Sequence, residues 1–233
     1  APAGGTEGWV ARMTAGSDNL TGQFGTYHGL AEYDQVYFVQ RDATGRPYAF
    51  GQARTGMPIL GDVYSNPGSG QYITCFFEDL SDIAWQTTIG TESGTIDISP
   101  TAFLISDCDQ VYISGWGGQT NATGGTSAVA GSTTSGLPTT DSPFQSSTDG
   151  SDFYLAVLAP NAADLVYATF FGGQFANEHV DGGSSRFDPN GTVYQAVCAG
   201  CGSMDDFPST DNAWSPTNPS PNCNMGVFKF ELG

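Results

Sequence analysis

Residues 153–173 contain two apolar runs, Phe153-Tyr-Leu-Ala-Val-Leu158 and Tyr167-Ala-Thr-Phe-Phe-Gly-Gly173, and they decide the fold because their pattern recurs along the chain. The first run has earlier counterparts at 9–13 and 72–77, and it begins a fourth time at 227–232. The second run contains aromatic-x-Thr-x-x-Gly, which also occurs at Phe24/Thr26/Gly29 and Trp85/Thr87/Gly90. An ordered pattern that returns after about 60 to 80 residues indicates a repeat architecture with loops of variable length.

Two further features complete each repeat. The first is a turn led by aspartate before a tyrosine strand, and the second is a proline with an aromatic residue six positions later. The turns lie at Asp42…Tyr48, Asp107…Tyr112 and Asp188…Tyr194, and the pairs are Pro58/Tyr64, Pro138/Phe144 and Pro208/Trp214. Because proline cannot donate to a strand ladder, we expect these proline segments to be crossing loops. Their aromatics Tyr64, Phe144 and Trp214 are then expected to pack between neighbouring blades.

The repeats predict an all-β protein. Each contains four short apolar runs bounded by turn residues, which in the third repeat lie near 152–158, 165–171, 183–187 and 192–199. This predicts a β-propeller segment of about three four-stranded antiparallel blades plus one strand of a further blade, with a β-sandwich as the alternative. The predicted units are 1–70, 71–151 with a Gly/Ser/Thr-rich insertion at 117–136, 152–226, and the additional strand 227–233.

The composition argues against several classes of partner. The chain has 24 Asp and Glu residues against 6 Lys and Arg, and its formal charge is −18. Nucleic acid would be repelled, because its binding depends on Lys and Arg neutralising phosphates. No apolar stretch reaches the roughly 18 residues of a membrane span, so no membrane insertion is expected. The chain begins with Ala1 in mid-repeat, and we interpret it as a segment of a longer precursor.

Three of the five cysteines lie close together in the sequence, Cys198 and Cys201 at the end of a strand and Cys223 before the next one. A structural zinc site needs four ligands, and although His179 is available as the fourth, nothing in the pattern brings it near. A disulfide from Cys223 to Cys198 or Cys201 is therefore the favoured interpretation. Cys75 and Cys108 both lie in the second unit and form a second candidate pair.

Catalytic candidates are weak. His28 and His179 lie near glycine turns and are expected to be solvated, and no Gly-x-Ser-x-Gly elbow accompanies Ser184 and Ser185. Carboxylates for a glycoside hydrolase could come from Glu32, Asp34, Glu78, Asp79 or Glu178. No catalytic residue and no cofactor are assigned, although Ca²⁺ could be held by Asp-rich turns at Asp181, Asp188 and Asn190 or at Asp149 and Asp152.

The third repeat resembles the SBBP-type β-propeller repeats of large surface proteins secreted by gliding Bacteroidetes. The resemblance rests on the two runs quoted above and on Asp188-Pro-Asn-Gly-Thr-Val-Tyr194, Asp206-Phe-Pro-Ser-Thr210, Val197-Cys-Ala-Gly-Cys201 and Cys223-Asn-Met-Gly-Val-Phe-Lys-Phe230. It covers roughly 100–233 and is thinner over 1–99, where Pro58-Ile-Leu replaces the usual Pro-Thr-Thr. It implies an extracellular, cell-surface protein secreted by the type IX route.

The sequence thus favours a non-enzymatic structural or adhesive module of a large secreted protein, acting in adhesion, gliding or extracellular assembly. Its expected partners are other domains of the same large chain, copies of itself, or surface glycans. The alternative is a carbohydrate-binding propeller that uses Trp116 or Trp214 beside Asp and Asn side chains, and a hydrolase comes third. The exposure of the tryptophans distinguishes the structural module from the carbohydrate-binding propeller. Buried tryptophans support the structural module, and an exposed one supports a sugar site.

Overall fold

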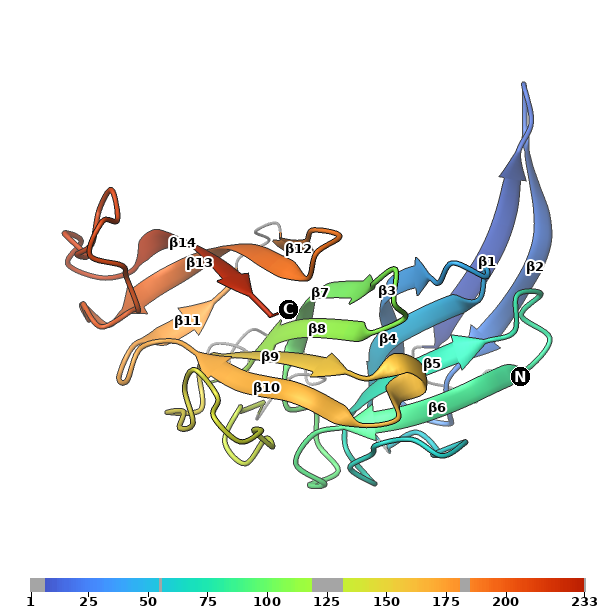
Figure 1. Cartoon of the computed structure of the whole chain (residues 1–233), viewed down its shortest axis with the longest axis horizontal. Helices are drawn as coiled ribbons and strands as arrows, with labels where there is room; N and C mark the ends of the chain where they lie inside the picture. Colours follow the sequence, from blue (N-terminus) through green and yellow to red (C-terminus); the bar gives the residue numbers. More distant parts are fainter. Residues whose placement is uncertain (1–6, 55, 119–131, 181–184, 233) are drawn as a thin grey trace.

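The computed structural model describes residues 7–54, 56–118, 132–180 and 185–232 (Figure 1). The predicted all-β fold is confirmed, with a single short 3-10 turn, η1 (Pro160–Ala162), among the described residues. No helix in these ranges is long and apolar enough to span a membrane. The strands are β1 (Gly8–Ala15), β2 (Leu20–His28), β3 (Asp34–Arg41), β4 (Pro47–Ala53), β5 (Gln71–Phe76), β6 (Ile83–Ile89), β7 (Ser99–Ile105), β8 (Val111–Trp116), β9 (Phe153–Leu158), β10 (Leu165–Phe171), β11 (Asn177–His179), β12 (Ser185–Phe187), β13 (Thr192–Cys201) and β14 (Asn224–Glu231).

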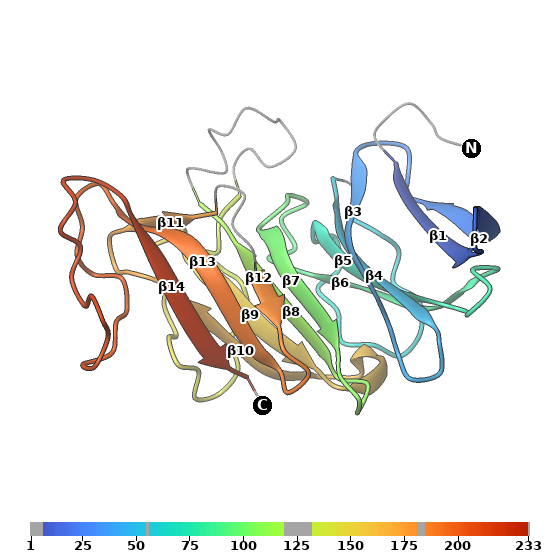
Figure 2. The ribbon, with the colours of Figure 1, turned by 90° about the horizontal axis from the view of Figure 1, so that it is seen from above.

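The strands form an N-terminal hairpin and three antiparallel sheets. The hairpin pairs β1 with β2, the first sheet has the order β3-β4-β5-β6, and the second has β7-β8-β9-β10 in chain order. In the third sheet β13 is central, with β14 on one side and the two short strands β11 and β12 on the other. Figure 2 shows the sheets following one another from the hairpin to β14. The described strands do not close into a ring, and the propeller stays a prediction.

The sheets are offset from the sequence repeats by half a unit. The first sheet combines the last two strands of the first repeat with the first two strands of the second repeat. The loop 54–70, which carries Pro58 and Tyr64, therefore joins neighbouring strands of one sheet, whereas it was expected to cross between blades. It follows the edge of β6, where Leu60 forms an isolated bridge with Gln86. The crossing instead occurs after the second strand of each repeat, at the repeated glycine.

The tight hairpins form as the aspartate-led turns predict. The Oδ1 atom of Asp42 accepts hydrogen bonds from the backbone N–H groups of Thr44 and Arg46, both at 2.9 Å. Asp188 makes the equivalent bonds to the N–H groups of Asn190 and Thr192. These side chains replace backbone partners that the turn residues lack, so they fix the register of each hairpin.

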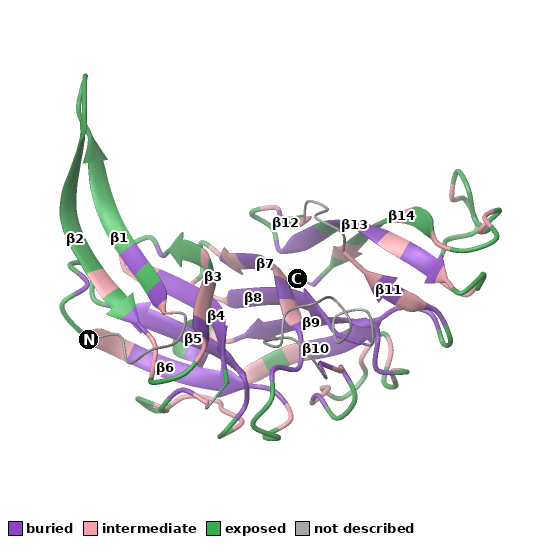
Figure 3. Cartoon of the chain, turned by 180° about the vertical axis from the view of Figure 1, so that it is seen from behind, coloured by how far each residue is buried: buried purple, intermediate pink, exposed green. Residues whose placement is uncertain are grey.

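Two hydrophobic cores join successive sheets. One lies between the first and second sheets and contains the aromatic side chains Tyr48, Phe50, Phe103 and Tyr154. The other lies between the second and third sheets and contains Phe153, Phe171, Val193, Val197 and Phe228. Central strands such as β5, β8 and β9 are buried along their whole length, because each of their two faces packs into a different hydrophobic cluster (Figure 3). Each fully buried large apolar side chain contributes about 1.5–3 kcal/mol to the free energy of unfolding.

Candidate functional site

A glycine and a carboxylate mark each place where the chain leaves one sheet for the next. The carboxylate lies five to seven residues after the glycine in the sequence. It accepts a hydrogen bond from the backbone N–H of the residue directly after that glycine. The three sets are Gly29, Leu30 and Asp34, then Gly90, Thr91 and Asp97, then Gly172, Gly173 and Glu178. All three carboxylate residues are buried. The repeated glycine therefore belongs to a crossing turn that is closed by a carboxylate.

The third crossing turn brings two buried carboxylates together. Asp152, at the start of β9, and Glu178, in β11, are both fully buried and both approach Gly172. A side chain at Gly172 would collide with Asp152 Oδ1 and would lie 2.8 Å from Glu178 Oε2. Among the described residues neither of these two oxygens has a hydrogen-bond partner. Asp152 is held from its other side by Gln145, whose Nε2 donates to Oδ2 at 3.0 Å.

Burial changes the acidity of this pair. It raises the pKa of Asp152 to about 7, with the nearby charge of Asp149 adding to the shift. It also raises the pKa of Glu178 to about 8, with the charges of Asp152 and Asp149 contributing. Two carboxyl groups in one buried place can share a proton, or they can bind a hard cation through oxygen ligands.

The other two crossing turns differ in the number of carboxylates that they hold. In the second turn Ser69 occupies the place of Asp152, so Asp97 is the single carboxylate there. In the first turn Glu7 and Asp34 both lie near Gly29, each with an oxygen 2.7 Å from the position of an added Cβ. The second turn demonstrates that one carboxylate is enough to close the loop. The second carboxylate is therefore an addition that the turn itself does not require.

The predicted calcium residues are only partly brought together. Asp149 and Asp152 lie in the same region, and the structure adds Glu178 and Asp206, whose oxygens face Gly172 and Gly173. Asp188 and Asn190 instead form the hairpin turn between β12 and β13. Asp181 lies outside the described residues. The spacing of five to seven residues after each repeated glycine is the signal that could have identified Glu178 as part of a structural turn.

The hydrolase candidates are dispersed. Glu78 is exposed and pairs with Arg12 at 2.7 Å, and Asp79 accepts a hydrogen bond from Ser81 at the surface. Asp34 closes the first crossing turn, and Glu32 is exposed. Ser184 lies outside the described residues. His28 is buried at 5% exposure, contrary to the expected solvation, because it packs edge-on between Tyr72 and Phe76.

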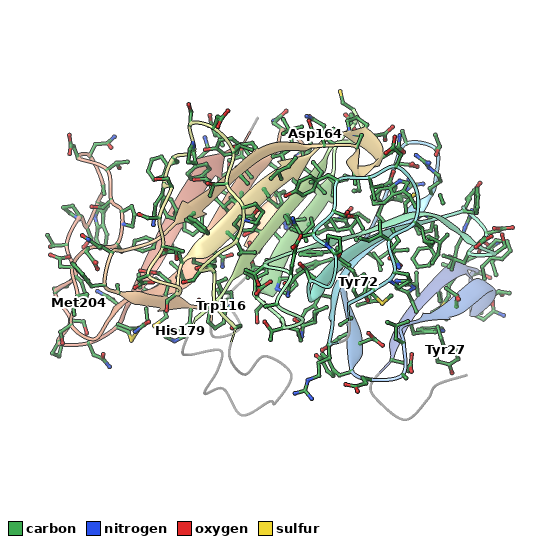
Figure 4. All side chains as sticks on the ribbon, turned by 90° about the horizontal axis from the view of Figure 1, so that it is seen from below. Tyr27, Tyr72, Trp116, Asp164, His179 and Met204 are labelled. Atoms are coloured by element: carbon green, nitrogen blue, oxygen red, sulfur yellow. A yellow bond between two sulfur atoms is a disulfide. The ribbon has the colours of Figure 1, made fainter. Side chains whose placement is uncertain are left out.

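The two candidate sugar-binding tryptophans differ completely in exposure. Trp116 ends β8 and is only 7% exposed, and its ring lies beside His179 with 6.2 Å between centroids (Figure 4). Trp214 is 100% exposed in the loop before β14. Trp214 therefore takes no part in packing between the described sheets, which corrects that expectation. The loop projects beyond the β13–β14 pair, where no described sheet faces it (Figure 1).

The other two proline-linked aromatics contact neighbouring sheets, Tyr64 as a half-buried side chain and Phe144 as one that is 61% exposed. Tyr64 packs against the core that the first and second sheets share, and its N–H donates to the carbonyl of Ala162 at 2.8 Å. The ring of Phe144 contacts Phe171 of the second sheet and Phe230 of the third, with centroids 5.8 and 5.4 Å apart.

The cysteines pair in one of the two favoured ways. Cys201 and Cys223 form a disulfide that closes the loop before β14. Cys75 and Cys108 do not pair, which corrects that expectation. Cys75 is buried in β5 inside the first sheet, whereas Cys108 is exposed in the turn between β7 and β8 of the second sheet.

Comparisons with known proteins do not assign the chain to a family. No protein-family model matches the chain, and no curated protein is significantly similar to it.

Proposed function

We propose that the chain is a non-enzymatic structural module of a large secreted cell-surface protein, acting in adhesion, gliding or assembly of an external structure. Its partners are further sheets of the same polypeptide or copies of itself. The repeated side chains support this proposal because they are used for turns, crossings and packing between sheets. The strong acidity and the disulfide are typical of proteins in an oxidising, extracellular setting.

The observation that carries the proposal is an unpaired apolar face at each end of the row of sheets. On β1, Val10 packs against Ala49 and Phe76 of the first sheet, while Trp9 on the opposite face is 56% exposed. Trp9 is paired across the hairpin with Tyr27, which is 65% exposed and is labelled in Figure 4. Exposed apolar faces of this kind are typical of interaction surfaces.

The opposite end shows the same arrangement. On β14, Phe228 points into the core, whereas Met225 and Val227 are exposed on the outer face. One strand from each sheet, β3, β7 and β12, lies in a row in which β7 contacts both of the others, which is the arrangement expected for inner strands of a propeller. Further sheets could therefore continue the row from either end.

Sedimentation velocity over a range of protein concentrations tests the proposal. We expect concentration-dependent self-association of the wild-type chain and a monomer near 24.4 kDa after Trp9→Ser and Tyr27→Ser. Val166→Ser is the matched control, because Val166 is 50% exposed on β10, away from both ends. A wild-type chain that stays monomeric at every concentration, or a control that dissociates equally, would rule out copies of the chain as the partner of this face.

Carbohydrate binding is the second candidate, and the full exposure of Trp214 favours it. The next residues in the chain, Ser215 and Pro216, line a hollow of about 90 Å³. A polysaccharide that changes tryptophan fluorescence in the wild type and in Trp116→Phe, but not in Trp214→Ala, would place the sugar at this loop.

A further inference from the structure

The third sheet gathers four potential metal ligands at one end. His179 is the last residue of β11 and lies opposite Cys198 of β13. Cys201 ends β13, and Cys223 directly precedes Asn224, which lies opposite Ala199 at the start of β14. Three adjacent strands therefore bring together residues that span more than forty positions of the sequence. The pairing of the strands supplies the proximity of His179 that the sequence pattern does not indicate.

A bulge makes the two cysteines of β13 point the same way. In a regular strand, residues three positions apart lie on opposite faces. Here the pairing shifts between Asn177 and His179, so that three steps along β13 match two steps along β11. Gly200 adopts a positive φ of 66° within this bulge, a conformation that glycine tolerates best. A Cβ at Gly200 would also lie 2.6 Å from the carbonyl oxygen of Met204.

The ligand atoms have the separations of a tetrahedral site. The Sγ atoms of Cys198 and Cys201 are 3.6 Å apart, and the Sγ of Cys201 lies 3.6 Å from Nδ1 of His179. The three atoms all lie within 4.8 Å of one another. Zinc–sulfur bonds of about 2.3 Å and zinc–nitrogen bonds of about 2.0 Å give tetrahedral edges of roughly 3.6–3.8 Å. The disulfide bond holds the Cys223 sulfur next to this group.

We propose that His179, Cys198, Cys201 and Cys223 form a structural Cys₃His site for Zn²⁺ when the Cys201–Cys223 bond is reduced. A dithiol reductant supplies the two electrons and two protons that open the disulfide, and it is itself oxidised to a disulfide. Binding of Zn²⁺ then releases three protons from the three thiols, while neutral His179 donates through its ring nitrogen. The disulfide is the oxidised, metal-free state of the same cluster.

The chemistry of the ligands selects the ion. Thiolate and imidazole ligands in a tetrahedral arrangement favour zinc over calcium or magnesium, which take oxygen ligands. Four protein ligands leave no open position, so the site is structural rather than catalytic. A disulfide alone accounts for Cys201 and Cys223, but it gives no reason for Cys198 and His179 to lie against the same sulfur. This proposal is independent of the proposed function of the whole chain.

Cobalt and zinc titrations of the reduced chain test the site. The full chain is reduced, freed of metal with a chelator and titrated anaerobically with Co²⁺, whose visible absorption reports tetrahedral thiolate coordination. We expect one equivalent of Co²⁺ to bind and one equivalent of Zn²⁺ to displace it. Native mass spectrometry should then find one zinc ion per chain.

Two variants separate the metal site from a simple disulfide, because they replace residues outside that bond. Cys198→Ser and His179→Asn should each weaken zinc binding by more than about 100-fold, since even outer-shell changes cost 10–100-fold. Both variants should still form the Cys201–Cys223 disulfide on oxidation, as shown by peptide mapping. Cys108→Ser, in an exposed turn of the second sheet, is the control and should bind zinc normally. A reduced, folded wild type without a thiolate–cobalt spectrum, or a Cys198→Ser variant with unchanged affinity, would overturn the proposal.

Discussion

At the scale of single residues, His28 links three strands through a chain of hydrogen bonds. Its Nε2 lies 2.8 Å from Oγ1 of Thr74, and that hydroxyl donates to Oε1 of Gln86 at 2.7 Å. Because a hydroxyl has one proton and uses it for Gln86, His28 Nε2 must carry the proton in this bond. His28 is thus a buried imidazole that joins the N-terminal hairpin to the first sheet.

The titration of His28 should appear in the pH dependence of the free energy of unfolding. Burial lowers the pKa of His28 to about 4, below its usual value of 6.5. The folded state therefore binds fewer protons than the unfolded state between these values, and stability falls as the pH decreases from 6.5 to 4. We expect His28 to account for a loss of about 2–3 kcal/mol between pH 7 and pH 4.5, measured by urea unfolding.

His28→Gln is the matched variant, since its amide can still donate to Thr74. The difference in unfolding free energy between wild type and variant should shrink by about that amount as the pH decreases to 4.5. A constant difference across this pH range would show that His28 titrates normally in the folded protein.

Asp152 should give the opposite pH dependence. Burial raises its pKa to about 7, so the folded state binds more protons than the unfolded state above pH 4. Its stabilising contribution is complete below the unfolded pKa of about 4 and is lost as the pH rises through 7, a change of up to about 4 kcal/mol. Asp152→Asn removes one of the two titrating carboxyl groups and should reduce this slope, while the raised pKa of Glu178 keeps a slope of the same sign. Thermal unfolding in chelator from pH 5 to pH 8 would measure the difference.

Addition of calcium tests whether Asp152 also acts as a metal ligand. At pH 9, above the raised pKa values of both carboxyl groups, millimolar Ca²⁺ should raise the melting temperature of the wild type but not of Asp152→Asn. Asp97→Asn, in the crossing turn that has a single carboxylate, should leave the calcium response unchanged. An absent response in the wild type would mean that the predicted calcium is not held at this turn.

At the scale of elements, strand positions could be predicted from sequence and strand partners could not. The runs at 9–13, 72–77, 153–158 and 227–232 fall within observed strands or extend one residue beyond their ends, because short apolar segments between turn residues have few other uses. The repeat shows what recurs, but it does not show where one sheet ends. That boundary depends on the crossing turns, whose carboxylates follow the repeated glycines at variable distances.

In the candidate sites, too, local features could be predicted from the sequence, whereas contacts between strands could not. The sequence could identify Cys201–Cys223 as one of two favoured disulfides, because short loops and cysteine spacing are local information. The position of His179 beside Cys201 depends on the register of β11 on β13 and on one bulge, which no sequence period encodes. The repeat predicts packing for Trp214 because the equivalent residues Tyr64 and Phe144 contact a neighbouring sheet. No described sheet follows Trp214, and its side chain is fully exposed.

At the scale of the whole molecule, net charge opposes compaction. The formal charge is −18, and the described cations make ion pairs such as Arg46–Asp42 and Lys229–Glu231 that neutralise few of the 24 acidic residues. Self-repulsion destabilises the folded state and is screened by salt, because the Debye length falls from about 30 Å at 0.01 M to about 3 Å at 1 M. Protein stability should therefore increase with ionic strength.

We expect the melting temperature to rise by about 2–5 °C between 10 mM and 500 mM NaCl, measured by calorimetry at pH 7, since about 1 kcal/mol shifts a domain of this size by 2–4 °C. Asp62→Asn, Asp107→Asn and Asp141→Asn together are the matched variant, because these three aspartates are exposed. They reduce the charge from −18 to −15, and repulsion scales with the square of the charge. The salt-dependent rise should then shrink by roughly 30%. An equal rise in both proteins would indicate that salt acts through the hydrophobic surfaces at the two ends rather than through charge.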